Sequence, residues 1–131
     1  MSGALVLDTH VLLWVLLDPG RVPEVTLTRI RDPRNDLLVS AASAWEIATK
    51  ARPGNLGGAD AVVHGYADHL ALLGAGELPV TSADALTAGS LSWEHRDPFD
   101  RMIAAQCIRR SYPLVTADET LTAFPAVTTL W

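Results

Sequence analysis

The segment Ala4-Leu5-Val6-Leu7-Asp8-Thr9-His10 joins an apolar run to an acid at position 8. Four apolar residues in a row that stop at a charged residue predict a short buried strand, Ala4 to Leu7. The residues that follow, Thr9 to Leu17, predict a helix that ends at Asp18-Pro19-Gly20. A buried strand that leads directly into a helix is typical of a parallel sheet covered by helices.

The same alternation of strand and helix continues along the chain. Further strands are predicted at 37–39, 78–81, 114–116 and 127–130, and further helices at 23–31, 59–73, 97–112 and 119–124. Ser40 and Ser82 are predicted to cap helices that run to about Arg52 and Leu91, and 53–58 is a loop rich in Gly and Pro. No linker or repeat interrupts the pattern. We therefore predict one domain, residues 1–131, with an α/β fold and a mainly parallel sheet.

The composition narrows the class of protein. The chain has 131 residues, 15 acidic and 10 basic, and is 49% hydrophobic, so it can bury enough surface to fold as one domain. The apolar run Val11 to Leu17 is far shorter than the roughly 20 residues that cross a bilayer, so no membrane span is predicted. A single cysteine, Cys107, excludes an internal disulfide and a cysteine-based zinc site. The expected location is the cytoplasm.

Acids stand where predicted strands end and helices begin. Asp8 follows the first strand, and Asp118 follows Leu114-Val115-Thr116-Ala117 in the same relation. In an open parallel sheet, ligands bind outside the carboxyl ends of the strands, so these two acids are placed to share one crevice. Asp100 lies in the first turn of its helix, on the apolar stripe expected to face the sheet. A carboxylate facing inward needs a cation or hydrogen-bond donors.

Each acid also has a purely structural interpretation. An Asp between a strand and a helix is often an N-cap, which applies to Asp8 and Asp118. Asp97-Pro98-Phe99-Asp100 resembles a capping box, with Asp97 as the cap. Glu46 and Lys50 have the spacing of a solvated i,i+4 ion pair, and periodicity alone does not point Glu46 inward.

Convergence of several acids favours a metal site over separate caps. Carboxylates gathered at one edge of a sheet repel each other unless a hard divalent cation lies among them, and Mg²⁺ suits such oxygen ligands. Such an ion activates water for attack on a phosphodiester, so the protein needs no nucleophile of its own. The sequence contains no phosphate-binding glycine loop and no HExxH motif, which excludes P-loop and zincin chemistry.

Four segments together resemble, in order and over essentially the whole chain, the acidic motifs of PIN-domain ribonucleases, and more narrowly a VapC-type toxin of a type II toxin-antitoxin pair. The segments are Leu5 to His10, Ser40 to Ile47, His95 to Gln106 and Leu114 to Asp118. The resemblance implies a three-layer α/β/α sandwich and RNA cleavage that depends on Mg²⁺ or Mn²⁺.

The resemblance also implies roles for individual residues. Asp8, Glu46, Asp100 and Asp118 match the acidic quartet, with Asp8 and Asp100 as the main metal ligands. Thr116 matches a polar residue that supports the site. Asp97 stands in the third motif either as a helix cap or as a contributor to the site. For Glu46, the resemblance takes precedence over the ion-pair interpretation.

The implied function is that of a toxin endoribonuclease. Its implied partners are a cognate VapB-like antitoxin, an RNA substrate and a second copy of the chain in the complex. The alternative is a PIN-like module that binds a partner with little or no catalysis. Arg96 and Arg101 lie near the third motif and are candidates to hold the RNA strand, because guanidinium groups bind phosphate in a bidentate manner. Surface salt bridging is the alternative for both arginines.

Overall fold

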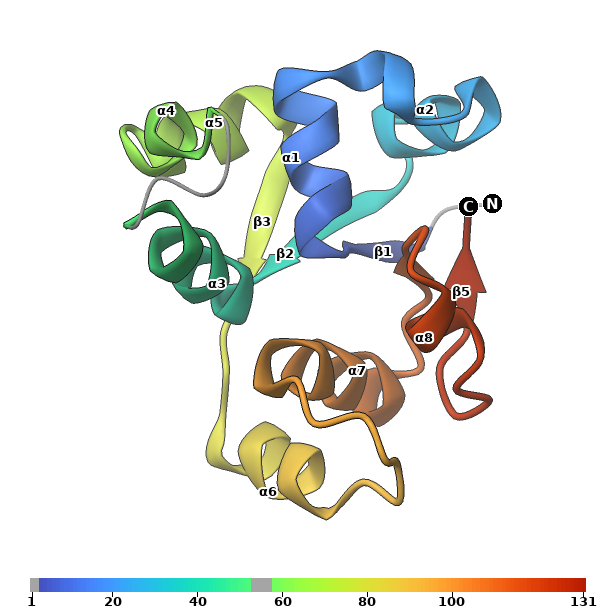
Figure 1. Ribbon diagram of the computed structural model, residues 1–131. Helices are drawn as coiled ribbons and strands as arrows, with labels where there is room; N and C mark the ends of the chain where they lie inside the picture. Colours follow the sequence, from blue (N-terminus) through green and yellow to red (C-terminus); the bar gives the residue numbers. More distant parts are fainter. Residues whose placement is uncertain (1–2, 53–57) are drawn as a thin grey trace.

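The five strands form one parallel sheet. The computed structural model describes residues 3–52 and 58–131, and helices cover both faces of the sheet (Figure 1). The strand order is β3-β2-β1-β4-β5 and every neighbouring pair is parallel. The strands are β1 (Ala4–Leu7), β2 (Asp36–Ser40), β3 (Ala75–Leu78), β4 (Leu114–Val115) and β5 (Thr129–Leu130). The predicted α/β/α sandwich with a parallel sheet is confirmed.

The helices are short and lie in two layers. α7 covers one face of the sheet and α6 packs against α7, whereas α1, α2, α4 and α5 lie on the other side (Figure 1). Within the described residues, no helix combines the length and apolarity that a membrane span requires. The helical segments are α1 (Thr9–Leu17), η1 (Pro19–Arg21), α2 (Glu24–Arg31), α3 (Ala41–Ala51), α4 (Ala59–Val63), α5 (Tyr66–Leu73), α6 (Ser82–Ser90), α7 (Pro98–Arg110) and α8 (Glu119–Thr122).

The order of the strands reverses next to β1. The chain passes from β1 outward through β2 to β3, then crosses to the opposite side of β1 to form β4 and β5. β1 and β4 pair directly, with Val6 opposite Leu114 and Leu7 opposite Val115. Connections that leave two adjacent strands in opposite directions open a crevice at the carboxyl ends of those strands. The fold therefore places a crevice between the residues that follow β1 and β4.

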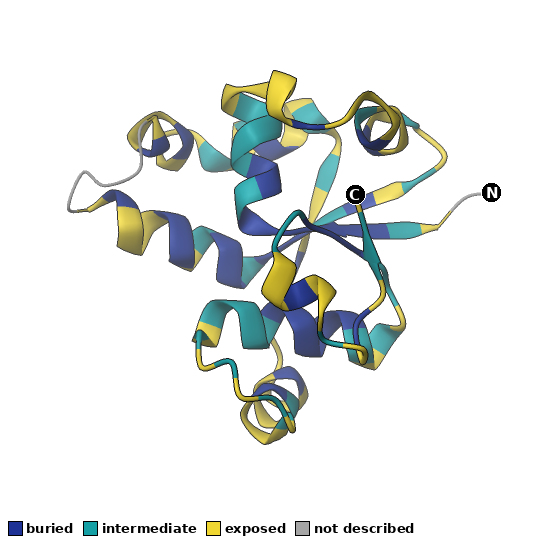
Figure 2. Cartoon of the chain, turned by 45° about the vertical axis from the view of Figure 1, so that its right-hand side comes forward, coloured by how far each residue is buried: buried dark blue, intermediate teal, exposed yellow. Residues whose placement is uncertain are grey.

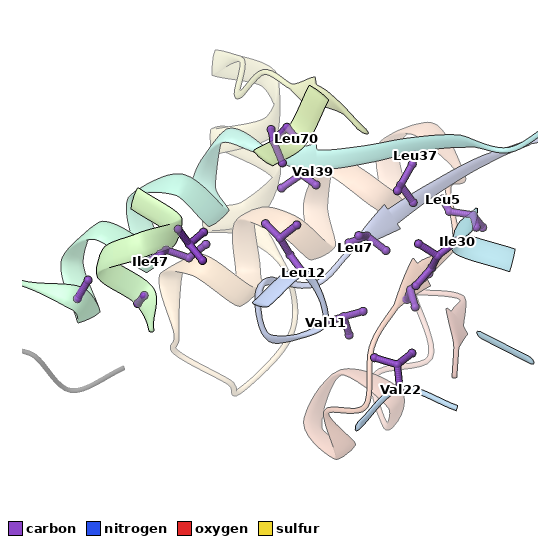
Figure 3. Close-up of a cluster of buried hydrophobic side chains, with 14 residues drawn as sticks. Leu5, Leu7, Val11, Leu12, Val22, Ile30, Leu37, Val39, Ile47 and Leu70 are labelled. Atoms are coloured by element: carbon purple, nitrogen blue, oxygen red, sulfur yellow. The ribbon is translucent and has the colours of Figure 1, made fainter. Parts of the chain in front are cut away.

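Alternating side chains of the strands enter two separate cores. Leu5 and Leu7 of β1 pack in one cluster with α1 and α2 (Figure 3). Val6 packs in the other cluster with α7. β4 divides in the same way between Val115 and Leu114. Burial on both faces explains why the central strands are continuous apolar runs, which Figure 2 shows as a dark band through the molecule.

Two predicted elements are wrong in position. The strand predicted at 78–81 is β3, Ala75–Leu78; Pro79 has no N–H for the sheet ladder. The helix predicted at 59–73 is two helices, because His64 leaves helical geometry after α4 and Gly65 adopts φ 68 before α5 begins. The glycine-rich loop predicted at 53–58 lies outside the described residues, except for Gly58.

The cap of α6 also differs from the prediction. Thr81, not Ser82, is the N-cap: its side chain accepts a hydrogen bond from the Asp84 amide. The Asp84 carboxylate accepts one from the Thr81 amide in return, at 3.0 Å. This reciprocal pair is a capping box.

Candidate metal centre in an acidic groove

A pocket of about 210 Å³ opens at the carboxyl edge of the sheet, where the strand order reverses. It brings together the four acids of the predicted quartet, which come from the ends of β1 and β4 and from α3 and α7. Asp97 lies with them. We call this pocket the acidic groove; it is lined by Asp8, Thr9, His10, Leu13, Glu46, Lys50, Asp97, Asp100 and Asp118.

A larger hollow of about 620 Å³ lies at the opposite edge, near the start of β2. Asp32 and Asp36 are its only acids among the described residues. Asp32 already forms a side-chain ion pair with Arg34, which holds the pKa of Asp32 at about 2 through its hydrogen bonds. This hollow therefore lacks a cluster of free acids, and we place the candidate site in the acidic groove.

Asp8 is both a helix cap and a groove acid. Its carboxylate is 2% exposed and accepts a hydrogen bond from the Thr9 amide at 2.9 Å. The other oxygen accepts one from the Thr116 hydroxyl at 2.7 Å. Thr116 Oγ1 in turn accepts from the Asp118 amide at 3.0 Å. Thr116 thus connects two acids of the quartet across the β1–β4 junction.

His10 strengthens the same junction. The Ala117 amide donates to His10 Nε2 at 3.2 Å, so this nitrogen carries no proton. The ring proton is therefore on Nδ1, which lies 3.2 Å from Asp8 Oδ2. Trp14 packs against the ring edge to face, with centroids 4.8 Å apart. His10 thus lies between the Ala117 amide and the Asp8 carboxylate and orients that carboxylate.

Asp100 projects from the first turn of α7 into the groove. Burial raises the pKa of Asp100 to about 6, although the hydrogen bond to His95 Nε2, 2.7 Å long, acts in the opposite direction. The negative charges of Asp8, Asp97 and Glu46 raise this pKa further. Crowded carboxylates without a divalent cation behave in this way.

Glu46 is buried, and its two carboxylate oxygens differ in their hydrogen bonding. The residue is 6% exposed, and one carboxylate oxygen accepts a hydrogen bond from Lys50. Within the part of the chain that the structure describes, the other oxygen, Oε1, has no hydrogen-bond partner. The predicted i,i+4 pair with Lys50 is present, but it lies in the groove and not on a solvated face.

The remaining two acids cap helices at the rim of the groove. Asp118 accepts a hydrogen bond from the Thr120 amide at 2.8 Å and begins α8. Asp97 accepts from the amides of Phe99 and Asp100, at 2.9 and 3.1 Å, through a single oxygen. Capping and a place in the groove are therefore compatible for Asp8, Asp97 and Asp118.

The arginines of the third motif do not line the groove. Arg96 is exposed. The guanidinium of Arg101 donates hydrogen bonds to four backbone carbonyls in and beside the loop between α6 and α7, those of Ala88, Leu91, Trp93 and His95. Arg101 therefore holds the loop that carries His95, and this geometry does not support its predicted role in binding RNA.

The donor set of the groove fits a hard divalent cation. No three His, Cys, Asp or Glu side chains in residues 3–52 and 58–131 already stand in a metal-binding arrangement. The groove nevertheless gathers the oxygens of five carboxylates, including Oε1 of buried Glu46, which has no partner among the described residues. Mg²⁺ and Mn²⁺ prefer such ligands, and a cation would relieve the repulsion that adds to the effect of burial on the pKa of Asp100.

Three basic residues that line the groove or contact its acids were not among the predicted site residues: His10, Lys50 and His95. His10 stands two residues after Asp8, and His95 stands five before Asp100, so each lies within a motif that was quoted for its acid. The spacing of Lys50 from Glu46 predicts only a surface ion pair. The burial of Glu46, which would have identified Lys50, depends on how α3 packs against α7.

A conservative change of Asp97 separates capping from metal binding. We expect Asp97→Ser to retain most of the activity and stability, because serine still accepts from the α7 amides while losing the negative charge. Asp97→Ala should lower the free energy of unfolding by about 1 kcal/mol. Urea denaturation and cleavage assays check this. A folded Asp97→Ser protein with no activity would place Asp97 among the metal ligands.

The fold and the groove together define a class of protein: an α/β sandwich with clustered carboxylates at the carboxyl edge of a parallel sheet, beside the reversal of strand order. The chain belongs to the PIN domain family, whose model matches residues 5–127. That range contains every residue of the acidic groove. Among curated proteins, none matches the chain.

Solved structures of toxin-antitoxin proteins have a similar fold over nearly the whole chain. VapBC2 from Rickettsia felis, bound to a DNA fragment from its promoter, gives a TM-score of 0.67 at 12% identity, with 97% of each chain covered. DNA-bound VapBC from Salmonella typhimurium gives 0.66 at 19%, covering 97% of this chain and 96% of that one. VapBC-5 from Mycobacterium tuberculosis gives 0.62 at 20%, with 97% of each covered. At such identities the likeness shows the fold.

Proposed function

We propose that the protein is a metal-dependent endoribonuclease that acts as the toxin of a toxin-antitoxin pair. The observation that carries this proposal is the acidic groove, in which five carboxylates meet at the reversal of strand order. One of them, Glu46, is buried with an oxygen that no described group satisfies. Membership of the PIN domain family and similarity to solved VapBC structures support the same function.

Asp8, Glu46, Asp100 and Asp118 are the residues proposed to hold Mg²⁺ or Mn²⁺. When bound, such an ion lowers the pKa of water and neutralises charge that develops on a phosphodiester. Thr116 and His10 keep the Asp8 carboxylate in a single orientation, because each contacts the same oxygen of Asp8. The Thr116 hydroxyl also fixes the Asp118 backbone. These contacts pre-organise the ligand oxygens before an ion arrives.

The proposed partner is a VapB-like antitoxin, and a second copy of the chain is proposed to join it in the complex. Three of the structurally similar proteins were solved as VapBC systems, two of them with DNA. The groove carries an excess of negative charge, so an antitoxin segment that covers it would present a basic side chain.

Removal of divalent metal tests the proposed chemistry. We expect cleavage of a single-stranded RNA to require Mg²⁺ or Mn²⁺ and to disappear in excess EDTA, because clustered carboxylates do not activate water without a cation. Gel analysis of RNA ends checks this, with readdition of Mn²⁺ as the control. Full cleavage in EDTA would contradict the metal mechanism. Failure to cleave any RNA with either metal would favour the alternative of a partner-binding module.

A further inference from the structure

Lys50 is the only lysine in the chain, and it lies on the wall of the acidic groove. The described residues that line the groove include five carboxylates, and Lys50 is the one permanent cation among them. His10, the other basic side chain there, accepts a hydrogen bond from the amide of Ala117 through Nε2. The ammonium of Lys50 is therefore the counterion for the carboxylates of the groove.

The ammonium covers Glu46 from the solvent side. Lys50 donates to Oε2 of Glu46, and the lysine side chain is 45% exposed whereas that of Glu46 is 8% exposed. Lys50 Nζ also lies 6.0 Å from the centre of the Phe99 ring, next to Asp100 in sequence. The flexible stem of a lysine lets such an exposed ammonium leave one acceptor for another without a change in the backbone.

Two cations would compete for the same carboxylate. A divalent ion held by Glu46 would neutralise the charge that holds Lys50 and would repel its ammonium at short range. The released ammonium remains at the mouth of the groove, because its backbone is in the last turn of α3. A phosphate group that approaches the groove acids would meet this ammonium, which supplies donors but no acceptor.

We propose that Lys50 exchanges partners, binding Glu46 in the metal-free protein and a phosphate oxygen of the RNA backbone once a divalent cation occupies the groove. This inference rests on the proposed function and adds a residue for substrate binding. It predicts that the loss of Lys50 has opposite effects on the affinities for metal and for RNA. A purely structural ion pair would not produce that combination.

The predicted effect of Lys50 on metal affinity is measured without RNA. Titration of Mn²⁺ into the protein by calorimetry should show binding about fivefold tighter in Lys50→Gln than in wild type, because the competing cation is gone. Arg52→Gln is the matched control: it removes the same charge from an exposed residue at the end of α3 that does not line the groove. Its metal affinity should change by less than about twofold.

The predicted effect on RNA affinity is measured by fluorescence anisotropy of a labelled single-stranded RNA. Ca²⁺ replaces Mg²⁺ in this experiment, and a gel verifies that the RNA stays intact. Lys50→Gln should bind about tenfold more weakly and lower the slope of log affinity against log salt by about 0.7, the value for one lost phosphate contact to a single strand. Lys50→Arg should keep most of the affinity and the slope, because it keeps the cation.

The outcomes separate this inference from the proposed function. If wild-type protein binds no Mn²⁺ and cleaves no RNA, the proposed function fails and this inference fails with it. If wild type binds Mn²⁺ but Lys50→Gln leaves metal affinity unchanged, the competition is wrong while the proposed function stands. An unchanged salt slope in folded Lys50→Gln would overturn the phosphate contact.

Discussion

Asp100→Asn is expected to abolish metal-dependent RNA cleavage and, at pH 7, to raise the melting temperature of the metal-free protein. Activity is lost because the amide is a poor ligand for Mg²⁺ and lacks the charge that a cation site needs. Stability rises because the buried Asp100 carboxylate, whose side chain is 14% exposed, is charged at pH 7 at a cost. Differential scanning calorimetry with EDTA and a cleavage assay with Mg²⁺ measure the two effects.

The pKa of Asp100 sets the pH range of this stabilisation. Burial raises the pKa to about 6, so the folded protein holds this proton while the unfolded chain loses it near pH 4. Stability therefore falls as pH rises between these values, and the penalty is complete above pH 6. The shift sets an upper bound of about 3 kcal/mol, and we expect a gain of about 1 kcal/mol because the amide is buried too.

The gain from Asp100→Asn should disappear at pH 4, where the wild-type carboxyl is also neutral in the folded state. Asp60→Asn, at an exposed position in α4, is the control and should change stability by less than about 0.5 kcal/mol at either pH. A lowered melting temperature for Asp100→Asn at pH 7 would mean that the carboxylate is mainly structural. Wild-type cleavage by this variant would remove Asp100 from the proposed ligands.

Asp84→Asn should cause a large loss of stability, although Asp84 lies outside the groove. The Asp84 side chain is fully buried and forms ion pairs with Arg109 and Arg110 of α7, and it also closes the capping box with Thr81. Asparagine retains an acceptor for the Thr81 amide but leaves both arginines without their counterion. We expect the free energy of unfolding to fall by about 3 kcal/mol, the lower end for a broken buried pair, because both arginines reach solvent.

The pH dependence gives a second readout for Asp84. Burial alone would raise the pKa of Asp84, but the hydrogen bonds from Arg110, the Thr81 amide and Arg109 hold it well below its usual range. The resulting stability is present above about pH 4 and is lost as pH falls further, toward the folded-state pKa. Urea denaturation at pH 7 and at pH 3 should show that Asp84→Asn costs less at pH 3.

An exposed aspartate, Asp68, provides the control for the loss of stability in Asp84→Asn. Asp68→Asn, in the first turn of α5, should change the free energy of unfolding by less than about 0.5 kcal/mol. Equal effects of Asp84→Asn and Asp68→Asn would show that the two arginine pairs contribute nothing measurable. These pairs connect α6 to α7. Asp84→Asn is therefore also expected to loosen the loop between α6 and α7, which carries His95 and which Arg101 holds.

Local sequence determines much of this protein. The apolar run Ala4 to Leu7 predicts β1 in its observed position, because a strand buried on both faces has no polar alternation to obscure it. The acids Asp8 and Asp118 follow their strands directly, so their place at the carboxyl edge also follows from sequence. Asp97 is recognisable as a cap because Pro98 excludes helical geometry for the residue before it.

Where local signals conflict, sequence misplaces the elements. The apolar residues Leu78 to Val80 resemble a strand, but pairing with β2 selects Ala75 to Leu78, which includes Gly76 and the exposed Glu77. The periodicity of 59–73 continues through Gly65, although its backbone adopts a positive φ that ends a helix. Both errors arise because sheet pairing and backbone handedness are not visible in hydrophobic periodicity.

Only the tertiary structure decides how the groove is assembled. The reversal of strand order that makes β1 and β4 neighbours depends on pairings between distant segments. The contact of His10 with Ala117 spans 107 positions, and it selects the tautomer that orients Asp8. Glu46 turns inward because α3 packs against α7, so a residue that resembles a surface partner of Lys50 becomes a buried acid with an unsatisfied oxygen. Helix and strand periodicity report which face of an element is apolar, whereas the polar contacts within the groove depend on the packing of several elements at once.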